Sequence, residues 1–136
     1  MAHLGRVAED YHSALVAGVL PDWIELPGGL IGRQRIVRFA EERLQHVAQR
    51  RPESLLFCLL HTPLVLASPQ YLGYRPDVDR RRVEFVRQVS VSRLLLVAVK
   101  FLDDEGEAWV STTHPFDMVH LTRRLRAGTM QIVRGS

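Results

Sequence analysis

The stretch RLLLVAVKFL, residues 93–102, predicts a strand at the centre of a β-sheet. Its apolar run is continuous rather than alternating, which is typical of a strand covered on both faces. The alternating segment RRVEFVRQV (residues 81–89) precedes it, and EAWVSTTH (residues 107–114) follows after the acidic turn DDEG. Because these three segments have short connections, we expect an antiparallel meander with Lys100 beside residues 108–110.

Helical patterns lie mainly before this meander. Apolar residues recur at helical spacing over residues 3–19 and again over residues 40–50. Pro52 stands where another helix can begin, and we expect that apolar helix to be interrupted or to end near Pro63. Shorter elements are also expected: strands at residues 23–26 and 33–39, a turn at residues 71–77, a basic helix at residues 118–128 and an edge strand at residues 130–133.

The composition is that of one globular domain. The chain has 136 residues, of which 46% are hydrophobic and 24% charged, and helices followed by a sheet indicate an α+β fold over residues 1–136. Only one of the 18 basic residues is lysine. Arginine binds phosphate with two parallel hydrogen bonds, so nucleic acid is a candidate partner. Codon usage in a GC-rich genome is the alternative explanation for the arginine content.

The cellular compartment follows from features that the sequence lacks. Cys58 is the single cysteine, so an internal disulfide is excluded and a buried thiol is expected. The first residues lack the layout of a signal peptide, and no apolar run reaches the ~18 to 20 residues that span a membrane. We therefore expect a cytoplasmic protein. The histidine spacings match no metal site and the glycines form no nucleotide loop, so we expect no metal and no cofactor.

Two segments carry side chains suited to chemistry on a phosphate. Arg43, His46 and Arg50 form a stripe beside the apolar face of the predicted helix 40–50. His46 could serve as general acid or base, although an exposed histidine on a polar helix face has the same pattern. Lys100, at the end of the central strand, could stabilise a phosphate or reach solvent.

The neighbouring strands offer further candidates. Thr112 and His114 belong to the run STTHP, whose hydroxyls could orient a phosphate, although threonine favours strands in any case. Arg87 belongs to the arginine-rich segment 80–93. That segment forms either a charged edge that resists aggregation or a face that follows a phosphate backbone.

Several short motifs occur in an order that resembles one known family. RIVRFAEERLQHVAQRRPES (residues 35–54) resembles a strand followed by the pattern "eR…HI…rHPE", and HTPLVLASP resembles the apolar helix and L..P element that come next. EFVRQ, LLLVAVK and VSTTHP resemble the strands that complete the pattern. Over about residues 34–116, the chain is similar to the phage-type Barnase–EndoU–colicin–RelE-like (BECR) nuclease domains.

The resemblance implies a fold and a reaction. The fold would be N-terminal helices on one face of a curved antiparallel sheet of about four strands, with an RNA cleft on the other face. The reaction would be metal-independent cleavage of RNA by attack of the ribose 2′-hydroxyl on the adjacent phosphate. Residue by residue, the resemblance assigns catalysis to His46, Lys100 and Thr112, and phosphate binding to Arg51, Arg87 and His114.

One position departs from the family pattern. Arg51 stands where the family has a histidine, and arginine cannot act as a base at neutral pH. Proton transfer would then fall to His46 or His114, or the domain would be inactive. We therefore predict a toxin-like endoribonuclease, with an inactive RNA-binding or protein-interaction module as the alternative. The expected partners are RNA, an inhibitory protein and a second copy of the chain, with no membrane.

Overall fold

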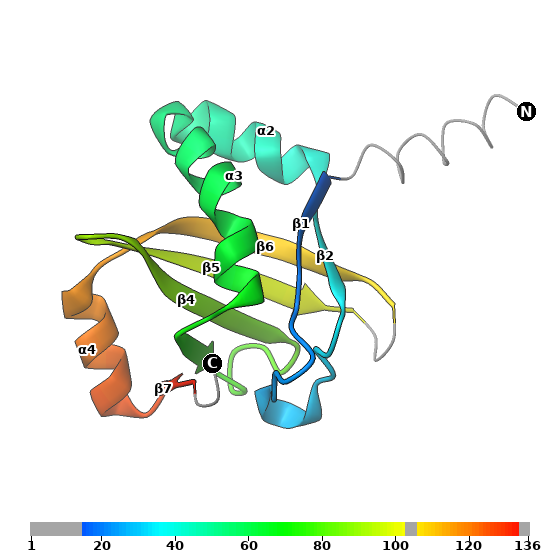
Figure 1. Cartoon of the computed structure of the whole chain (residues 1–136), viewed down its shortest axis with the longest axis vertical. Coiled ribbons are helices and arrows are strands. Elements are labelled where there is room, and N and C mark those ends of the chain that lie inside the picture. Colours follow the sequence, from blue (N-terminus) through cyan, green and yellow to red (C-terminus); the bar gives the residue numbers. More distant parts are fainter. Residues whose placement is uncertain (1–14, 103–105, 134–136) are drawn as a thin grey trace, which may run out of the picture.

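The computed structural model of the chain describes residues 15–102 and 106–133, which form one mixed sheet with helices on both faces (Figure 1). The seven strands follow the order β1-β2-β6-β5-β4-β3-β7, and β2 and β6 are parallel. The strands are β1 (Leu15–Val19), β2 (Ile36–Phe39), β3 (Tyr71–Tyr74), β4 (Arg82–Ser90), β5 (Arg93–Phe101), β6 (Ala108–Phe116) and β7 (Met130–Ile132). The helices are α2 (Glu41–Arg50), α3 (Pro52–Ala67) and α4 (Met118–Ala127), with a 3-10 turn at Pro27–Gly29.

The central meander is confirmed. β5 pairs antiparallel with β4 on one side and with β6 on the other, and Lys100 lies opposite Trp109. The apolar run of β5 is buried on both faces, as its continuous pattern predicts. Leu95 and Val97 pack in the cluster that contains α3, whereas Leu96 packs in a second cluster with Leu121 of α4.

The expected sheet of about four strands with helices on one face is wrong. The described residues form seven strands, and α4 covers the face opposite α3. The additional strands are short and pair with segments that are distant in sequence: Leu15 lies opposite Phe39, and Tyr71 lies opposite Ile132. The α+β class itself is confirmed.

Four local predictions are also corrected. Residues 15–19 form β1 rather than the end of a helix, because pairing with β2 buries Ala17 and satisfies the backbone; residues 3–14 lie outside the described part. Residues 71–74 form β3 rather than a turn, and residues 23–26 form no strand. α3 runs through Pro63, since the helix buries Val65 and Leu66 in the core beyond it.

The corner between α2 and α3 follows from one proline. The ring of Pro52 disfavours helical backbone at the preceding residue, and Arg51 takes φ −144° and ψ 67°. α2 therefore ends at Arg50, and α3 starts with Pro52 at its first turn, where the missing N–H has no cost. The sequence RRP thereby places two arginines where one helix ends and the next begins.

No helix in the described residues combines the length and apolar character needed to cross a membrane. The N-terminus of α4 is capped by Asp117, whose carboxylate accepts a hydrogen bond of 2.8 Å from the backbone N–H of His120. Gly128 ends the helix in the left-handed conformation at φ 77°, which glycine adopts without strain.

Candidate functional site

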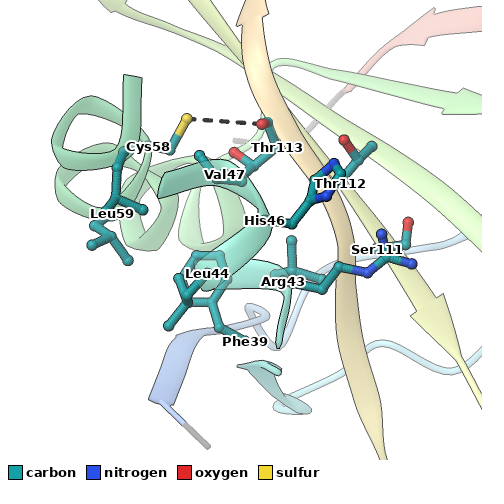
Figure 2. Close-up of a pocket in the computed structure, with 12 residues that line it drawn as sticks. Phe39, Arg43, Leu44, His46, Val47, Cys58, Leu59, Ser111, Thr112 and Thr113 are labelled. Carbon is teal, nitrogen blue, oxygen red and sulfur yellow. Dashed lines mark hydrogen bonds between the residues drawn. The ribbon is translucent and has the colours of Figure 1, made fainter. Parts of the chain in front are cut away.

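The site lies where β6 loses its neighbouring strand. Within the described residues, β2 pairs with β6 only at Ala108 and Trp109. Farther along β6, helix α2 takes the place of a strand, and Figure 2 shows His46 and Arg43 pointing toward Ser111 and Thr112. This arrangement leaves hollows between the helix and the strand, and His46 lines three of them.

The first hollow is strongly cationic and is called here the cationic hollow. Its volume is about 300 Å³. Among the described residues, no carboxylate lines it. Its polar lining comes from α2, the start of α3 and β6: His46, Arg50, Arg51, Ser54, Thr112, Thr113 and His114.

The positive potential of the cationic hollow has two sources. Arg50 and Arg51 carry permanent charge because guanidinium does not titrate in the physiological range. Ser54 lies in the first turn of α3, so the positive end of that helix dipole also faces the hollow. A tetrahedral anion such as a phosphate therefore suits this place.

His114 has a defined proton arrangement when it is neutral. Its Nδ1 lies 2.9 Å from the backbone oxygen of Pro115, and a carbonyl oxygen can only accept a hydrogen bond. Nδ1 must therefore carry the hydrogen, which leaves the lone pair of the neutral ring on Nε2. His46, on α2, is exposed, and His114, on β6, is half-buried. The two imidazoles therefore reach the cationic hollow from different elements.

A second, smaller hollow lies deeper and is called the inner pocket. It has a volume of about 100 Å³ between α2, α3 and β6 (Figure 2). Cys58 lines it, and its thiol donates to the backbone oxygen of Thr113 at 3.8 Å. Burial raises the pKa of the Cys58 thiol, while the side chain of Thr113 and the charge of Arg51 oppose this rise more weakly. The thiol is therefore neutral and not an activated nucleophile.

The third hollow is an open groove of about 850 Å³, called the lysine groove. It is lined by Arg43, His46, Lys100, Glu107, Trp109 and Ser111, among others. The Nζ of Lys100 forms an ion pair with the carboxylate of Asp79. Lys100 thus shares a hollow with His46 but lies outside the residues that line the cationic hollow.

Arg87 has a different position. Its Nη1 donates to the backbone oxygen of Ser68 at 2.9 Å, which satisfies a carbonyl at the C-terminal end of α3. Arg87 lines none of the three hollows. The structure therefore brings together four of the six candidates, His46, Arg51, Thr112 and His114, places Lys100 next to them and leaves Arg87 elsewhere.

Three polar residues of the cationic hollow, Arg50, Ser54 and Thr113, were not among the six candidates taken from the sequence. The sequence does indicate Arg50, because this residue completes the helical stripe with Arg43 and His46. Thr113 belongs to the run STTHP, but nothing in the sequence distinguishes it from Thr112, because threonine favours strands in any case. Its importance depends on which face of β6 it occupies.

Comparisons with protein-family models, with curated proteins and with solved structures returned no match for this chain. Within the described residues, no three histidine, cysteine, aspartate or glutamate side chains gather where they could hold a metal ion.

Asp79→Asn is expected to lower the free energy of unfolding at pH 7 by about 1 kcal/mol, since the ion pair with Lys100 is partly exposed. Hydrogen bonds from Lys100 and from the backbone N–H of Arg81 lower the pKa of Asp79 below its ordinary value of 3.8. The stabilisation is therefore present above pH 3.8 and is lost as the pH falls through the depressed pKa. Urea unfolding at pH 7 and at pH 3 should show the difference between variant and wild type shrinking in acid.

Asp77→Asn, on the exposed turn beside Asp79, is the matched control and should change stability little at either pH. A difference between Asp79→Asn and wild type that stays constant from pH 7 to pH 3 would contradict the role of the ionised carboxylate.

Proposed function

We propose that this chain binds RNA at the cationic hollow and cleaves it without a metal ion. The observation that carries the proposal is that two histidines, His46 and His114, line one hollow together with Arg50, Arg51 and Thr112. A pair of imidazoles can supply both proton transfers of a transesterification near neutral pH. The surrounding cations can stabilise the charge that develops on the phosphate.

The reaction proceeds by internal attack. One imidazole removes the proton of the ribose 2′-hydroxyl as its oxygen forms a bond to phosphorus. The bond from phosphorus to the 5′-oxygen of the next nucleotide breaks, and the other imidazole, as imidazolium, gives that oxygen its proton. The products are a 2′,3′-cyclic phosphate and a free 5′-hydroxyl, and no water or metal is consumed.

The remaining residues bind and orient the phosphate. Arg51 cannot accept a proton, but its guanidinium can bind two phosphate oxygens at once. Arg50 adds a second charge, and the hydroxyl of Thr112 can donate to a non-bridging oxygen. Lys100 faces the adjoining groove, where it can contact a neighbouring phosphate of the same strand.

A second candidate function is RNA binding without cleavage. It is favoured by the ion pair between Lys100 and Asp79, which engages the lysine that the resemblance assigns to catalysis. The inhibitory partner protein, the second copy of the chain and the cytoplasmic location remain predictions from the sequence. They apply equally to both candidate functions.

The two functions are separated by an assay of end-labelled oligoribonucleotides in EDTA. Cleavage should leave cyclic phosphate ends, and it should stop at a position where a single 2′-deoxynucleotide replaces the ribonucleotide. Binding of RNA by gel shift with intact substrate would favour the second function. Absence of both cleavage and salt-dependent binding would reject RNA as the partner.

A further inference from the structure

Thr113 is a buried residue with an unused polar group. It is 8% exposed, and its Oγ1 is enclosed without a hydrogen-bond partner among the described residues. A buried hydroxyl that lacks a partner costs free energy, and a ligand that supplies the missing hydrogen bond recovers it. Thr113 lines both the inner pocket and the cationic hollow, so such a ligand would lie at their junction.

The inner pocket has the size and walls for one small ring. Its volume is about 100 Å³, and its walls include Phe39, Leu44, Leu55, Leu59 and Val110. A closed apolar cavity of roughly 150 Å³ holds benzene, whereas pockets for drug-sized molecules start at about 300 Å³. The inner pocket is smaller than the benzene cavity but is open at its mouth, so one six-membered ring can enter it with its outer edge left at the mouth, and a fused two-ring system is too large.

The position of the inner pocket relates it to the phosphate. His46, Val47, Thr112 and Thr113 line both the inner pocket and the cationic hollow. Arg43 and His46 line the inner pocket but are exposed, so they lie at its mouth rather than in its depth. A neutral ring joined to a phosphate would place the ring inside and the charge outside.

We infer that the inner pocket binds the base of the nucleotide whose phosphate occupies the cationic hollow, and that the Oγ1 of Thr113 selects a single-ring pyrimidine. The inference rests on the proposed function, because it takes the ligand to be a nucleotide. A threonine hydroxyl both donates and accepts, so it serves uracil and cytosine alike. A purine is too large to enter the inner pocket and therefore cannot use this hydrogen bond.

The test is a set of titrations followed by ¹H–¹⁵N chemical shifts of the full chain. The probes are uridine 3′-monophosphate, adenosine 3′-monophosphate, uridine and inorganic phosphate. Uridine 3′-monophosphate should bind about tenfold more tightly than the adenosine compound, as expected for one recovered hydrogen bond. Thr113→Val, which keeps the shape of the side chain, should remove that advantage, because the phosphate is common to both compounds and only the pyrimidine enters far enough to use the hydroxyl.

Thr62→Val is the matched control, because Thr62 is also buried but its hydroxyl already donates to the backbone oxygen of Cys58 at 2.6 Å. Its preference for the uridine compound should equal that of the wild type. Leu55→Phe, at a half-buried wall position, is a second variant that should block uridine by filling the pocket.

The titrations can overturn three separate claims: the selection by Thr113, the inner pocket as the base site, and the proposed function. Equal affinity for the two nucleotides, or an unchanged preference in Thr113→Val, would overturn the selection by Thr113. Binding of uridine that persists in Leu55→Phe would overturn the inner pocket as the base site. Binding of uridine without any binding of inorganic phosphate would overturn the proposed function while leaving the ring pocket in place.

Discussion

His46→Ala is expected to lower the rate of RNA cleavage by about 100- to 10,000-fold, the usual contribution of one general acid or base. The affinity for RNA should change little, because the permanent charges of Arg50 and Arg51 remain. His114→Ala should have an effect of similar size. The measurement is kcat/KM on an oligoribonucleotide in EDTA, with binding measured on a 2′-deoxy analogue that cannot be cleaved.

A modified substrate assigns the two roles. When sulfur replaces the bridging 5′-oxygen, the leaving group departs as a thiolate and needs no proton. The variant that lacks the general acid should therefore regain activity on this substrate, and the variant that lacks the base should not. The wild-type pH profile of kcat/KM should be bell-shaped, and each variant should lose one limb of it.

His120→Ala is the matched control for both histidines. His120 is exposed on α4, next to Asp117, and lines none of the three hollows. Its loss should leave cleavage unchanged. Equal activity of wild type, His46→Ala and His114→Ala would contradict the assignment of proton transfer to this pair.

Arg124→Met is expected to lower the free energy of unfolding by about 3 to 5 kcal/mol, because it leaves a buried carboxylate without its main partner. The Nη2 of Arg124 lies 2.6 Å from Oε1 of Glu84, and the two side chains are only 12% and 10% exposed. Arg124 also donates to the hydroxyl and to the backbone oxygen of Thr129. The remaining charge near Glu84 is Arg82, at a longer distance of 3.7 Å.

The double variant Glu84→Leu/Arg124→Met should recover much of this loss, since apolar side chains of similar size can replace a buried ion pair. Arg123→Met, at the neighbouring exposed position of α4, should change stability by less than about 0.5 kcal/mol. The measurement is urea unfolding at pH 7. A loss below about 1 kcal/mol for Arg124→Met would show that the pair behaves as a surface ion pair.

The surroundings of this ion pair also explain why position 73 is a glycine. A Cβ atom at Gly73 of β3 would lie 2.5 Å from Oε1 of Glu84 and 2.8 Å from the terminal methyl of Met130. Atoms cannot approach so closely, so any larger residue would displace the Glu84 carboxylate from Arg124. The ion pair between α4 and β4 therefore depends on a residue of a third element.

Elements held together by neighbours in sequence were predicted well. The meander of β4, β5 and β6 was recognised because hairpins pair adjacent segments and each strand carries its own pattern. α2, α4 and the edge strand β7 also lie where their periodicity and turn residues indicate. β1 and β3 were missed because their short sequences gain a strand conformation only by pairing with distant partners.

The candidate site was likewise predicted only in part from the sequence. The stripe of Arg43, His46 and Arg50 was visible as helical spacing, and all three residues line the hollows along β6. Arg87 could not be separated from Arg51 by sequence, because both are arginines beside predicted elements. Only the packing of α3 shows that Arg87 binds a helix end while Arg51 faces the cationic hollow.

The sequence by itself determined the α+β class, the central strand at residues 93–101 and the corner at Pro52, because these depend on local pattern and on the covalent ring of proline. The tertiary structure alone decided that β2 leaves β6 after Trp109 and that α2 fills the vacated place. Because a helix lies there instead of a strand, His46 comes close to Thr112 and His114, and the hydroxyl of Thr113 is enclosed. Such contacts join segments far apart in sequence, and their geometry is set by the packing of the whole sheet.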